Sequence, residues 1–455
     1  AADTNRSAEA RFVVRPEVYR QRLGRDCWSS QEVTTQDVIR AVLADYPGVV
    51  RYELTRSYPT YPYRVQYRED DWTYISRLIE EEGIYAWFDH GDGDSEIVFS
   101  DDSTSSAPID GVPILTYTPA SGLRPDQDAI THVSFAAKAT PQRFAAKSFD
   151  PRKPTSPVES RQGEGRHEVY DAPGAGPSDP AILAARVQVA REAAGAARSQ
   201  IEGLATSVRP FPGRYFQLLG HPLSALGGEF FVVAVTLEGD TKVGISTRFR
   251  AIRREVPFRT PARTPRAKQP GLQLGQVIGP AGQEVHPDDL GRVRVQLHWD
   301  REGARDEHAG TWLRVSQRGS PGSRLLPRMG WNVATFNEEG GVDAPSTLMR
   351  IHDGDHPPEY GLPANKTRVV YKTKTTPDSP TFNEIYFEDR LGAEEMFINA
   401  SMDMHVRAKN RKSETVKNDS TRTVTGNYVL HVGEKMVDRV VQNQDVTIGG
   451  NEELV

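Results

Sequence analysis

The sequence predicts a mainly β protein with an α+β base, a small β-barrel in its middle and a repetitive β tail. Three observations support this fold class. The chain has 38 glycines and 32 prolines in 455 residues, which favours many turns and short strands. Amphipathic helical patterns are confined to the first 200 residues or so. Valine or isoleucine then recurs at every eighth position from Val416 to Ile448, which is typical of repeated short strands.

Composition excludes several classes of protein. The 455 residues correspond to two to four domains at roughly 100–200 residues per domain. A balance of 56 Lys and Arg against 62 Asp and Glu gives a net charge of −6, so we expect no nucleic-acid partner. No apolar run approaches the ~18 residues of a membrane span, and residues 1–20 lack the apolar core of a signal peptide. Cys27 is the single cysteine, which excludes an internal disulfide.

The first 140 residues mix helices and strands. Thr34 and Asp37 have the spacing of a capping box, and apolar residues follow at helical intervals until Pro47-Gly48. A second helix is predicted from Asp70-Asp71 to Gly83, with one apolar face. Residues 84–88 and 97–99 read as the two strands of a hairpin. This combination predicts an α+β domain.

The next part of the chain alternates irregular and regular patterns. Residues 141–177 are rich in Pro, Gly, Ser and charge, and are predicted to form a long loop. Asp179-Pro180 places proline at the first position of a third helix, which runs to about Ala197. Strands are predicted at 215–218 and 230–235. Residues 256–270 hold four prolines and five basic residues, and we interpret them as a linker between domains.

Short strands dominate from Gly271 to about Asp353. Val293, Val295, Leu297 and Trp299 alternate with polar residues, as in a half-buried strand. Further strands are predicted at 312–315 and 333–336, separated by Gly and Pro turns. About five short strands in some 80 residues suit a small barrel such as an OB-fold.

The tail carries the most specific pattern in the chain. Five β-branched residues are spaced eight apart without slippage: Val416, Val424, Val432, Val440 and Ile448. Eight residues leave only four or five for a strand, which is roughly 15 Å of extended chain. One such strand has a single inward side chain and cannot enclose a core. The repeat therefore predicts several chains that wind together, with the Val and Ile positions on a common axis.

Five stretches of the sequence are specific enough to compare with known families. They are RVQYREDDWTYISRLIEEEGIYAWFDH (64–90), PGRYFQLLGHPL (212–223), GPAGQEVHPDDLGRVRVQLHWDREG (279–303), LPANKT (362–367) and FNEIYFEDRLGAEEMFINA (382–400). In this order, and followed by the eight-residue repeats, they resemble VgrG proteins. These are the spikes of bacterial type VI secretion systems and are related to phage tail hub and cell-puncturing proteins.

The resemblance implies a domain organisation. It implies a tail-hub-like base at 1–255, a linker at 256–270, an OB-fold neck at 271–355, a connector at 356–381 and a needle at 382–455. The needle is expected to be a trimeric, intertwined β-prism or β-helix whose core is formed by the five repeat residues. Family members have further hub residues before the point where Ala1 aligns, and their needles continue. We therefore expect a base that lacks its N-terminal part and a needle truncated at Val455.

The resemblance also implies partners and a location. In the family, the trimeric hub docks on a tube of Hcp hexamers and the needle tip takes a PAAR-repeat protein. Baseplate proteins and effectors or their adaptors are further expected partners. The spike is assembled in the cytoplasm, secreted by the type VI machine without a signal peptide, and penetrates the envelope of a target cell. No enzymatic activity, cofactor or metal is expected.

Several short motifs could suggest chemistry, but a structural role explains each better. His352 to His356 and Asp89 to Asp94 are rich in metal ligands, yet both lack the remaining ligands of a site and are interpreted as turns. Gly163-Glu164-Gly165 is not flanked by a strand and a helix, as a dinucleotide motif requires. Glu80 to Glu82, near Asp70-Asp71, are interpreted as a solvated helix face rather than a catalytic carboxylate pair. Cys27 is interpreted as a packing residue.

Two alternative functions stay open at this point. A phage tail or an extracellular injection particle uses a hub and spike of the same architecture. A polysaccharide-degrading tailspike enzyme would need paired acids roughly 5–10 Å apart across a groove. The eight-residue repeats offer scattered single charges instead, so the sequence favours a structural spike.

Overall fold

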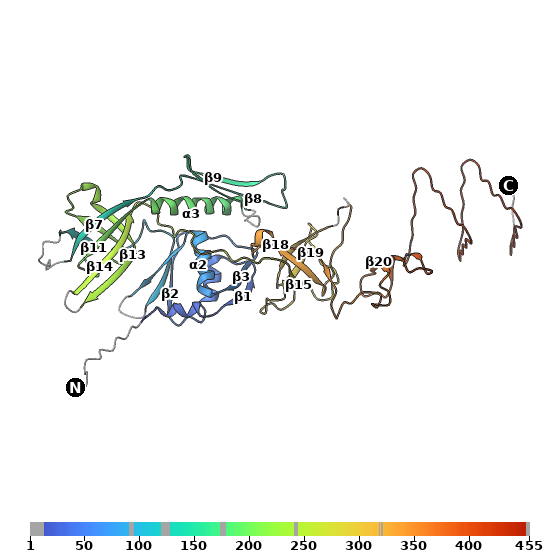
Figure 1. Cartoon of the computed structure of the whole chain (residues 1–455), viewed down its shortest axis with the longest axis horizontal. Helices are drawn as coiled ribbons and strands as arrows, with labels where there is room; N and C mark the ends of the chain where they lie inside the picture. Colours follow the sequence, from blue (N-terminus) through green and yellow to red (C-terminus); the bar gives the residue numbers. More distant parts are fainter. Residues whose placement is uncertain are drawn as a thin grey trace, which may run out of the picture.

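The computed structural model describes residues 13–90, 95–119, 128–172, 179–240, 244–317, 319 and 322–451. The molecule is elongated, with the helices and most strands at one end and the tail leading away from them (Figure 1). Along this axis lie, in order, a six-stranded barrel, the α+β base, a five-stranded barrel and a three-stranded sheet, with α3 above the first two (Figure 1). Among the described residues no helix has the length and apolarity that a membrane span requires.

The α+β base contains both helices that the sequence predicts in this region. Its helices are η1 (Glu17–Arg22), α1 (Thr35–Val42) and α2 (Asp71–Glu82). Its strands form two sheets, the pair β1 (Asp26–Ser30) and β3 (Arg64–Glu69) and the set of β2 (Val49–Glu53), β5 (Glu96–Ser100) and β4 (Tyr85–Asp89). The predicted capping box is confirmed, since the Thr34 hydroxyl accepts from the Asp37 amide and the Asp37 carboxylate accepts from the Thr34 amide. Gly83 ends α2 in the left-handed conformation, with φ 70°. The hairpin of β4 and β5 is confirmed as well.

Apolar stripes on both helices produce the core of the base. Ile39 of α1 and Ile75 of α2 are fully buried against Ile97 and Phe99 of β5 and against Ile84, which directly precedes β4. Spacings of three and four residues place the buried residues of a helix on one face, which packs on the sheet. The core of the base therefore lies entirely within one chain.

The six-stranded barrel lies on the side of the base that faces away from the five-stranded barrel (Figure 1). Its strands are β6 (Ile114–Tyr117), β7 (Ala129–Ala137), β11 (Ser199–Ala205), β12 (Tyr215–Leu219), β13 (Gly228–Asp240) and β14 (Gly244–Arg253), with η2 (Ser224–Leu226) between β12 and β13. The strands close in the order β11-β14-β13-β12-β6-β7. Phe216, Phe230 and Phe249 fill the interior, and the rings of Phe216 and Phe249 meet edge to face at 5.4 Å. The predicted strands at 215–218 and 230–235 are therefore part of this barrel.

The prediction of a long loop at 141–177 is wrong. The described part of this segment contains β8 (Arg143–Ser148), β9 (Val158–Gln162) and β10 (Glu168–Asp171), which form one sheet in the order β10-β8-β9. The predicted third helix is confirmed as α3 (Pro180–Arg198), and it covers this sheet through a small core that includes Phe144 and Leu183. High Pro, Gly and charge content concealed these strands, because only one face of so small a sheet needs apolar residues.

The predicted small barrel is confirmed as a closed five-stranded barrel. It consists of β15 (Gln273–Ile278), β16 (Val293–Leu297), β17 (Thr311–Val315), β18 (Asn332–Asn337) and β19 (Pro345–Ile351), with η3 (Glu338–Gly340) between β18 and β19. The order β15-β16-β17-β19-β18 is that of an OB-fold neck. Val277, Val293, Val295, Leu313 and Val333 form its core.

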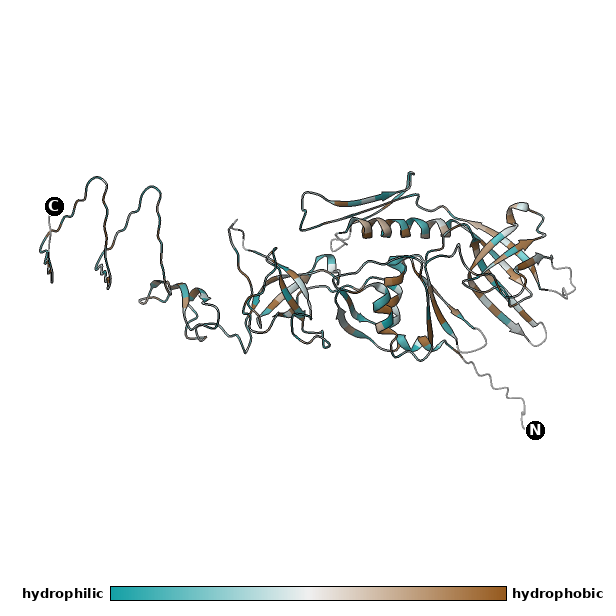
Figure 2. Cartoon of the chain, turned by 180° about the vertical axis from the view of Figure 1, so that it is seen from behind, coloured by the Kyte–Doolittle hydropathy of each residue, from teal (hydrophilic) through white to brown (hydrophobic). Residues whose placement is uncertain are grey.

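The tail differs from everything before it. A three-stranded sheet of β20 (Arg368–Lys374), β21 (Phe382–Glu388) and β22 (Glu395–Asn399) begins inside the predicted connector. Residues 400–451 contain no helix or strand, and extend away from the sheet (Figure 1). Figure 2 shows long hydrophobic stretches on the elements of the base and barrels but not along this tract. The domain borders at 255, 270, 355 and 381 stay predictions.

Candidate trimerisation interface

One face of the three-stranded sheet is apolar and exposed. Val369, Phe387 and Met396 lie side by side across β20, β21 and β22, and Ile385 lies beside Ile398. Alternate residues of a strand point to the same face, so all five side chains share one face. In the single chain each of these side chains is between 40% and 61% exposed. A contiguous apolar face of this kind marks an interaction surface.

The opposite face of the same sheet is complete within the chain. Glu384, Tyr386 and Glu388 of β21 are buried there. The Tyr360 hydroxyl donates to Glu384 at 2.7 Å, and the Arg368 guanidinium stacks on the Tyr386 ring at 4.3 Å. The Thr367 hydroxyl donates to Glu388, and this hydrogen bond lowers the pKa of that carboxyl. The sheet therefore buries its polar residues and exposes its apolar ones, which is the reverse of a solvated sheet.

The eight-residue repeat appears in the backbone as well as in the sequence. Paired bends recur every eight residues at 401–402, 409–410, 417–418, 425–426, 433–434, 441–442 and 449–450. Each of the five predicted core residues lies directly before such a bend. Ala408 and Ala400 occupy the same position one and two repeats upstream of Val416, and the Val/Ile period did not reveal them because alanine is not β-branched. The repeat thus begins where β22 ends.

The five predicted core residues are half covered in the single chain. Val416, Val424, Val432, Val440 and Ile448 are between 46% and 52% exposed, whereas Val429 and Val437 are 69% and 70% exposed. None of the hydrophobic clusters formed by the described residues includes any of the five. One chain places them in register along the tract but does not bring them together. Their role as a trimer core stays a prediction.

Sequence reasoning also missed the apolar face of the sheet. Its signal is present in the strand FNEIYFE of β21, where Ile385 and Phe387 alternate with Glu384, Tyr386 and Glu388. Alternation alone does not say which set is buried. The glutamates are buried here because the segment around Tyr360 and Arg368 supplies their partners from the same chain.

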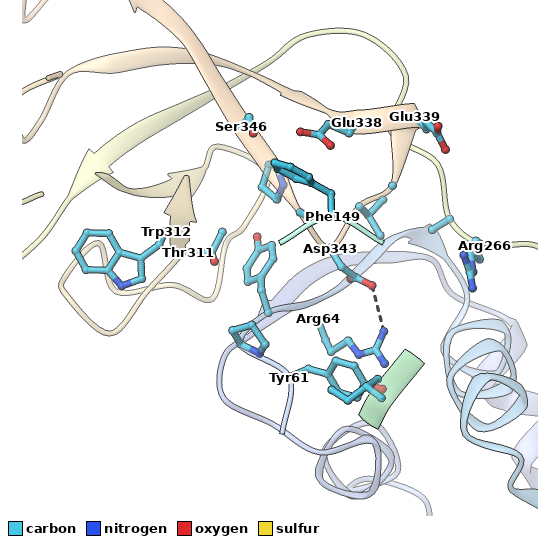
Figure 3. Close-up of a pocket in the computed structure, with 18 of the residues that line it drawn as sticks. Tyr61, Arg64, Phe149, Arg266, Thr311, Trp312, Glu338, Glu339, Asp343 and Ser346 are labelled. Carbon is cyan, nitrogen blue, oxygen red and sulfur yellow. Dashed lines mark hydrogen bonds and ion pairs between the residues drawn. The ribbon is translucent and has the colours of Figure 1, made fainter. Parts of the chain in front are cut away.

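A second candidate site is a cavity of about 680 Å³ where the base, α3 and the neck meet. Figure 3 shows Arg64 over the Tyr61 ring, with an interaction to Asp343 of the neck. The side chain of Arg64 is 2% exposed, and its Nη1 lies 3.3 Å from Glu81 and 3.2 Å from Asp343. Asp343 also accepts from the Val65 amide at 3.0 Å. These contacts make the cavity part of the joint between base and neck.

The prediction that Glu80 to Glu82 form a solvated helix face is wrong. Glu80 accepts from the amides of Arg263 and Thr264, and Glu82 accepts from the Tyr61 hydroxyl. The side chain of Glu81 lies within 3.3 Å of Arg64, Arg186 and Arg266. Burial alone would raise the pKa of Glu81, but the three arginines outweigh burial and lower it to about 2. These carboxylates therefore hold the base, α3 and the connecting segment together, and they do not form a free catalytic pair.

The other short motifs have structural surroundings. Asp353 accepts from the His356 amide at 2.7 Å and from Asn332 at 2.5 Å, which closes a turn after β19. Asp89 pairs with Arg51 and Arg214, while residues 91–94 of the same motif lie outside the described residues. Cys27 packs in a cluster with Tyr63 and Val65. Over the described ranges, no group of three or more His, Cys, Asp or Glu residues could hold a metal ion.

Two family models match separate parts of the chain. Residues 1–243 match the family model of the phage tail baseplate hub (GPD), and residues 369–455 match the bacteriophage T4 gp5 C-terminal trimerisation domain. The second match begins at the apolar sheet described above and includes all five predicted core residues. The first match lies within the expected hub region and the second overlaps the expected needle region, while the boundaries of both regions stay predictions.

Two similar proteins are named as spike proteins of type VI secretion systems. The type VI secretion system spike protein VgrG4b of Pseudomonas aeruginosa is 31% identical over 87% of this chain and 53% of its own length. VgrG1c of the same organism is 30% identical over 93% of this chain and 61% of its own length. The chain therefore spans little more than half the length of these relatives. The resemblance to VgrG proteins is confirmed.

A solved structure supports the fold. An E. coli component of the type VI secretion system, described as structurally similar to the T4 bacteriophage tail proteins gp27 and gp5, superposes with a TM-score of 0.53 at 20% identity. The superposition covers 74% of this chain and 76% of that chain. Because the hub model covers more than half of its residues, the chain belongs to the phage tail baseplate hub (GPD) family, and along most of its length it is similar to type VI secretion spike proteins.

Proposed function

We propose that the chain is a structural component of a contractile injection machine. It forms a homotrimeric spike that sits on the tip of the secreted tube, punctures the envelope of a target cell and delivers effectors. The hub family match, the trimerisation-domain match and the spike names of its relatives support this function. Because the chain spans only part of those relatives, the function of the whole machine is inferred from the part seen here.

The observation that carries the proposal is the incomplete core of the tail. Five β-branched residues stand eight apart, are half covered by their own chain, and follow a sheet with an exposed apolar face. Three chains related by one axis would bury all of these side chains at once. Apolar burial contributes roughly 25 cal/mol per Å², so a tract of repeated Val and Ile favours assembly strongly.

The physical role of the spike is stiffness. Three chains that hydrogen-bond to one another in a closed prism satisfy their backbone groups and have no free strand edges. The inward Val and Ile residues fix the register of the three chains. Polar residues elsewhere in the tract keep the shaft hydrated: Thr421, Thr423, Asn427, Arg439 and Gln442. The spike transmits the work of sheath contraction and catalyses no reaction.

The proposed partners follow from this role. The base of the trimer contacts the Hcp tube, a PAAR-repeat protein caps the needle, and baseplate proteins and effectors or adaptors bind around them. The spike assembles in the cytoplasm and leaves with the tube. One relative, from Vibrio cholerae, bears the name actin cross-linking toxin VgrG1, and this chain covers 36% of it. Such a relative is consistent with effector delivery by attached or bound toxins.

A second candidate function is a phage tail or extracellular injection-particle hub. The two family models, both described by phage proteins, favour it. Deletion of the gene distinguishes the two machines. A type VI spike is needed for release of the Hcp tube protein and for killing of neighbouring cells, whereas a phage hub is needed for infectious particles.

The test uses two matched pairs of substitutions in the full gene. Val424→Asp with Val432→Asp places charges at two predicted core positions, and Val429→Asp with Val437→Asp places the same charges at more exposed positions of the same repeats. We expect the first pair to abolish trimerisation and Hcp release, because burying unpaired carboxylates costs several kcal/mol each. In a deletion strain, the variant with the second pair should still form trimers and restore Hcp release. Normal Hcp release with the first pair contradicts the proposal.

A further inference from the structure

The base and the neck barrel share a hydrophobic core. Tyr63, Val65 and Tyr67, in and beside β3 of the base, are at most 9% exposed. Val342 of the neck belongs to the same cluster, and the ring of Trp299 of the neck lies 5.7 Å from that of Tyr67. Two domains of one chain usually move relative to each other unless their interface is large and hydrophobic. The shared core therefore favours a fixed orientation of the neck on the base.

Two loops of the neck hold the β1–β3 pair by polar contacts. Ser29 of β1 and Val65 of β3 lie opposite each other in this pair. The Ser29 hydroxyl donates to Asp300, in the loop after β16, at 2.6 Å. The Val65 amide donates to Asp343, in the loop before β19, at 3.0 Å, and the Arg64 guanidinium reaches the same carboxylate at 3.2 Å. Carboxylates from two different loops of the neck therefore bind neighbouring positions of the base.

Burial distinguishes these contacts from a third one at the surface. Asp300 is 6% exposed and the Arg64 side chain is 2% exposed, so water competes little for their hydrogen bonds. Arg152, in the loop after β8, also reaches the neck, at 3.3 Å from Asp289, but these two side chains are 53% and 70% exposed. An exposed ion pair contributes little to stability. The contacts of Asp300 and Asp343 are therefore expected to set the orientation of the neck, rather than the contact of Asp289.

We propose that Ser29 and Asp343 are positioning residues, which fix the orientation of the neck on the base within a single chain, before three chains meet. The inference rests on the proposed trimeric spike and goes beyond it, because the trimerisation-domain match begins only at residue 369 and does not include this joint. A chain whose parts are already oriented loses less conformational freedom on assembly. Each chain thus aims its needle segment in advance, and thrust on the base passes to the needle without bending at the neck.

Distances between spin labels test this preset orientation. Ala44→Cys, after α1 in the base, and Met349→Cys, on the neck, place the labels at exposed positions in a Cys27→Ser background. Pulsed electron paramagnetic resonance measures the distribution of distances between them, with labelled chain diluted into unlabelled chain so that pairs within one chain dominate. The measurement is made on the trimer and on the chain made monomeric by Val424→Asp with Val432→Asp. We expect one narrow distribution with the same mean distance in both states.

Two matched pairs of substitutions assign the orientation to the named residues. Ser29→Ala with Asp343→Ala removes one group from each polar contact, and the distribution in the monomer should become about twofold broader or more. Ser95→Ala with Asp288→Ala removes the same groups where they bond within the base and within the neck, and should leave the distribution narrow. Circular dichroism of both variants should match that of the parent.

The outcomes separate this inference from the proposed function. A broad distribution in the monomer that narrows in the trimer overturns the inference and leaves the trimeric spike standing. An unchanged, narrow distribution in the Ser29→Ala, Asp343→Ala monomer overturns the roles of these two residues. A parent chain that is itself monomeric overturns the proposed function, whereas a narrow distribution in that chain still supports the preset orientation.

Discussion

The base and the tail of this chain differ in how far their own residues bury their apolar side chains. In the base, Ile39, Ile75 and Phe99 are fully buried by residues of the same chain. In the tail, the apolar face of the β20–β22 sheet and the repeat residues from Val416 to Ile448 stay about half exposed. Both regions have the apolar residues of a core, but only the base has the layers to enclose it.

The difference indicates that the base can fold as a single chain, whereas the tail needs several chains to complete its core. A helix packed on a sheet closes a core within one chain, because each layer covers the other. An eight-residue repeat provides one inward side chain per strand and no second layer, so its core requires further chains. The base is expected to be stable at any protein concentration. The stability of the tail should depend on concentration through the assembly of three chains.

The largest expected effect comes from charges on the apolar face of the sheet. Ile385→Asp with Ile398→Asp places two carboxylates at neighbouring positions of that face. The concentration of half dissociation should rise by roughly a thousandfold or more, because each buried, unpaired charge costs several kcal/mol. Sedimentation of a dilution series measures it. Leu391→Asp, in the turn between β21 and β22, is the control and should leave the trimer unchanged. If the Ile385→Asp, Ile398→Asp variant dissociates no more readily than this control, the apolar face of the sheet takes no part in trimerisation.

A substitution in the six-stranded barrel, whose core is also closed within one chain, should have a smaller effect of a different kind. Phe249→Ala removes a fully buried ring from this barrel, where it contacts Phe216. We expect a loss of about 3–5 kcal/mol in the free energy of unfolding of the barrel. Urea titration at two protein concentrations measures this loss. The loss should be equal at both concentrations and the mass should stay that of the parent; a concentration-dependent loss would mean that the barrel also needs its neighbours.

The smallest expected effect is the part of the pH dependence that Glu81 of the base contributes. The pKa of Glu81 is about 2 in the folded chain, below the ordinary value of 4.5. Its contribution to stability is therefore complete above pH 4.5 and disappears as the pH falls toward 2. The shift corresponds to roughly 3 kcal/mol. Urea titrations at pH 6 and pH 3 should show a stability loss that is smaller in Glu81→Gln than in the parent, and the difference between the two losses is the contribution of Glu81; an equal loss in both would assign the pH dependence to other groups.

Local patterns in the sequence were enough to predict the local structure. Thr34 with Asp37, and Gly83 after an apolar stripe, predict helix ends because a cap depends on residues within one turn. The spacing from Val416 to Ile448 predicts the repeat for the same reason. The strands β8–β10 escaped prediction because their composition is that of a loop. The burial of Glu81 escaped it because Arg186 and Arg266 are distant in sequence.

The same limit explains what was missed at the candidate interface. The five repeat residues were found from their period, whereas Ala400 and Ala408 in the same positions were not. The apolar face of the sheet required the pairing of Val369 with Phe387 and of Ile385 with Ile398, which only the fold provides. The contact between Arg64 and Asp343, which joins base and neck, likewise links residues that no local pattern connects.

The mass of the unmodified chain in solution tests the central claim most directly. Sedimentation equilibrium, over a range of concentrations that includes the micromolar, reports the mass without reference to shape. The account predicts a species of three times the chain mass of 50.5 kDa that persists on dilution. A stable monomer of 50.5 kDa at micromolar concentration, with the repeat residues still exposed, would contradict it.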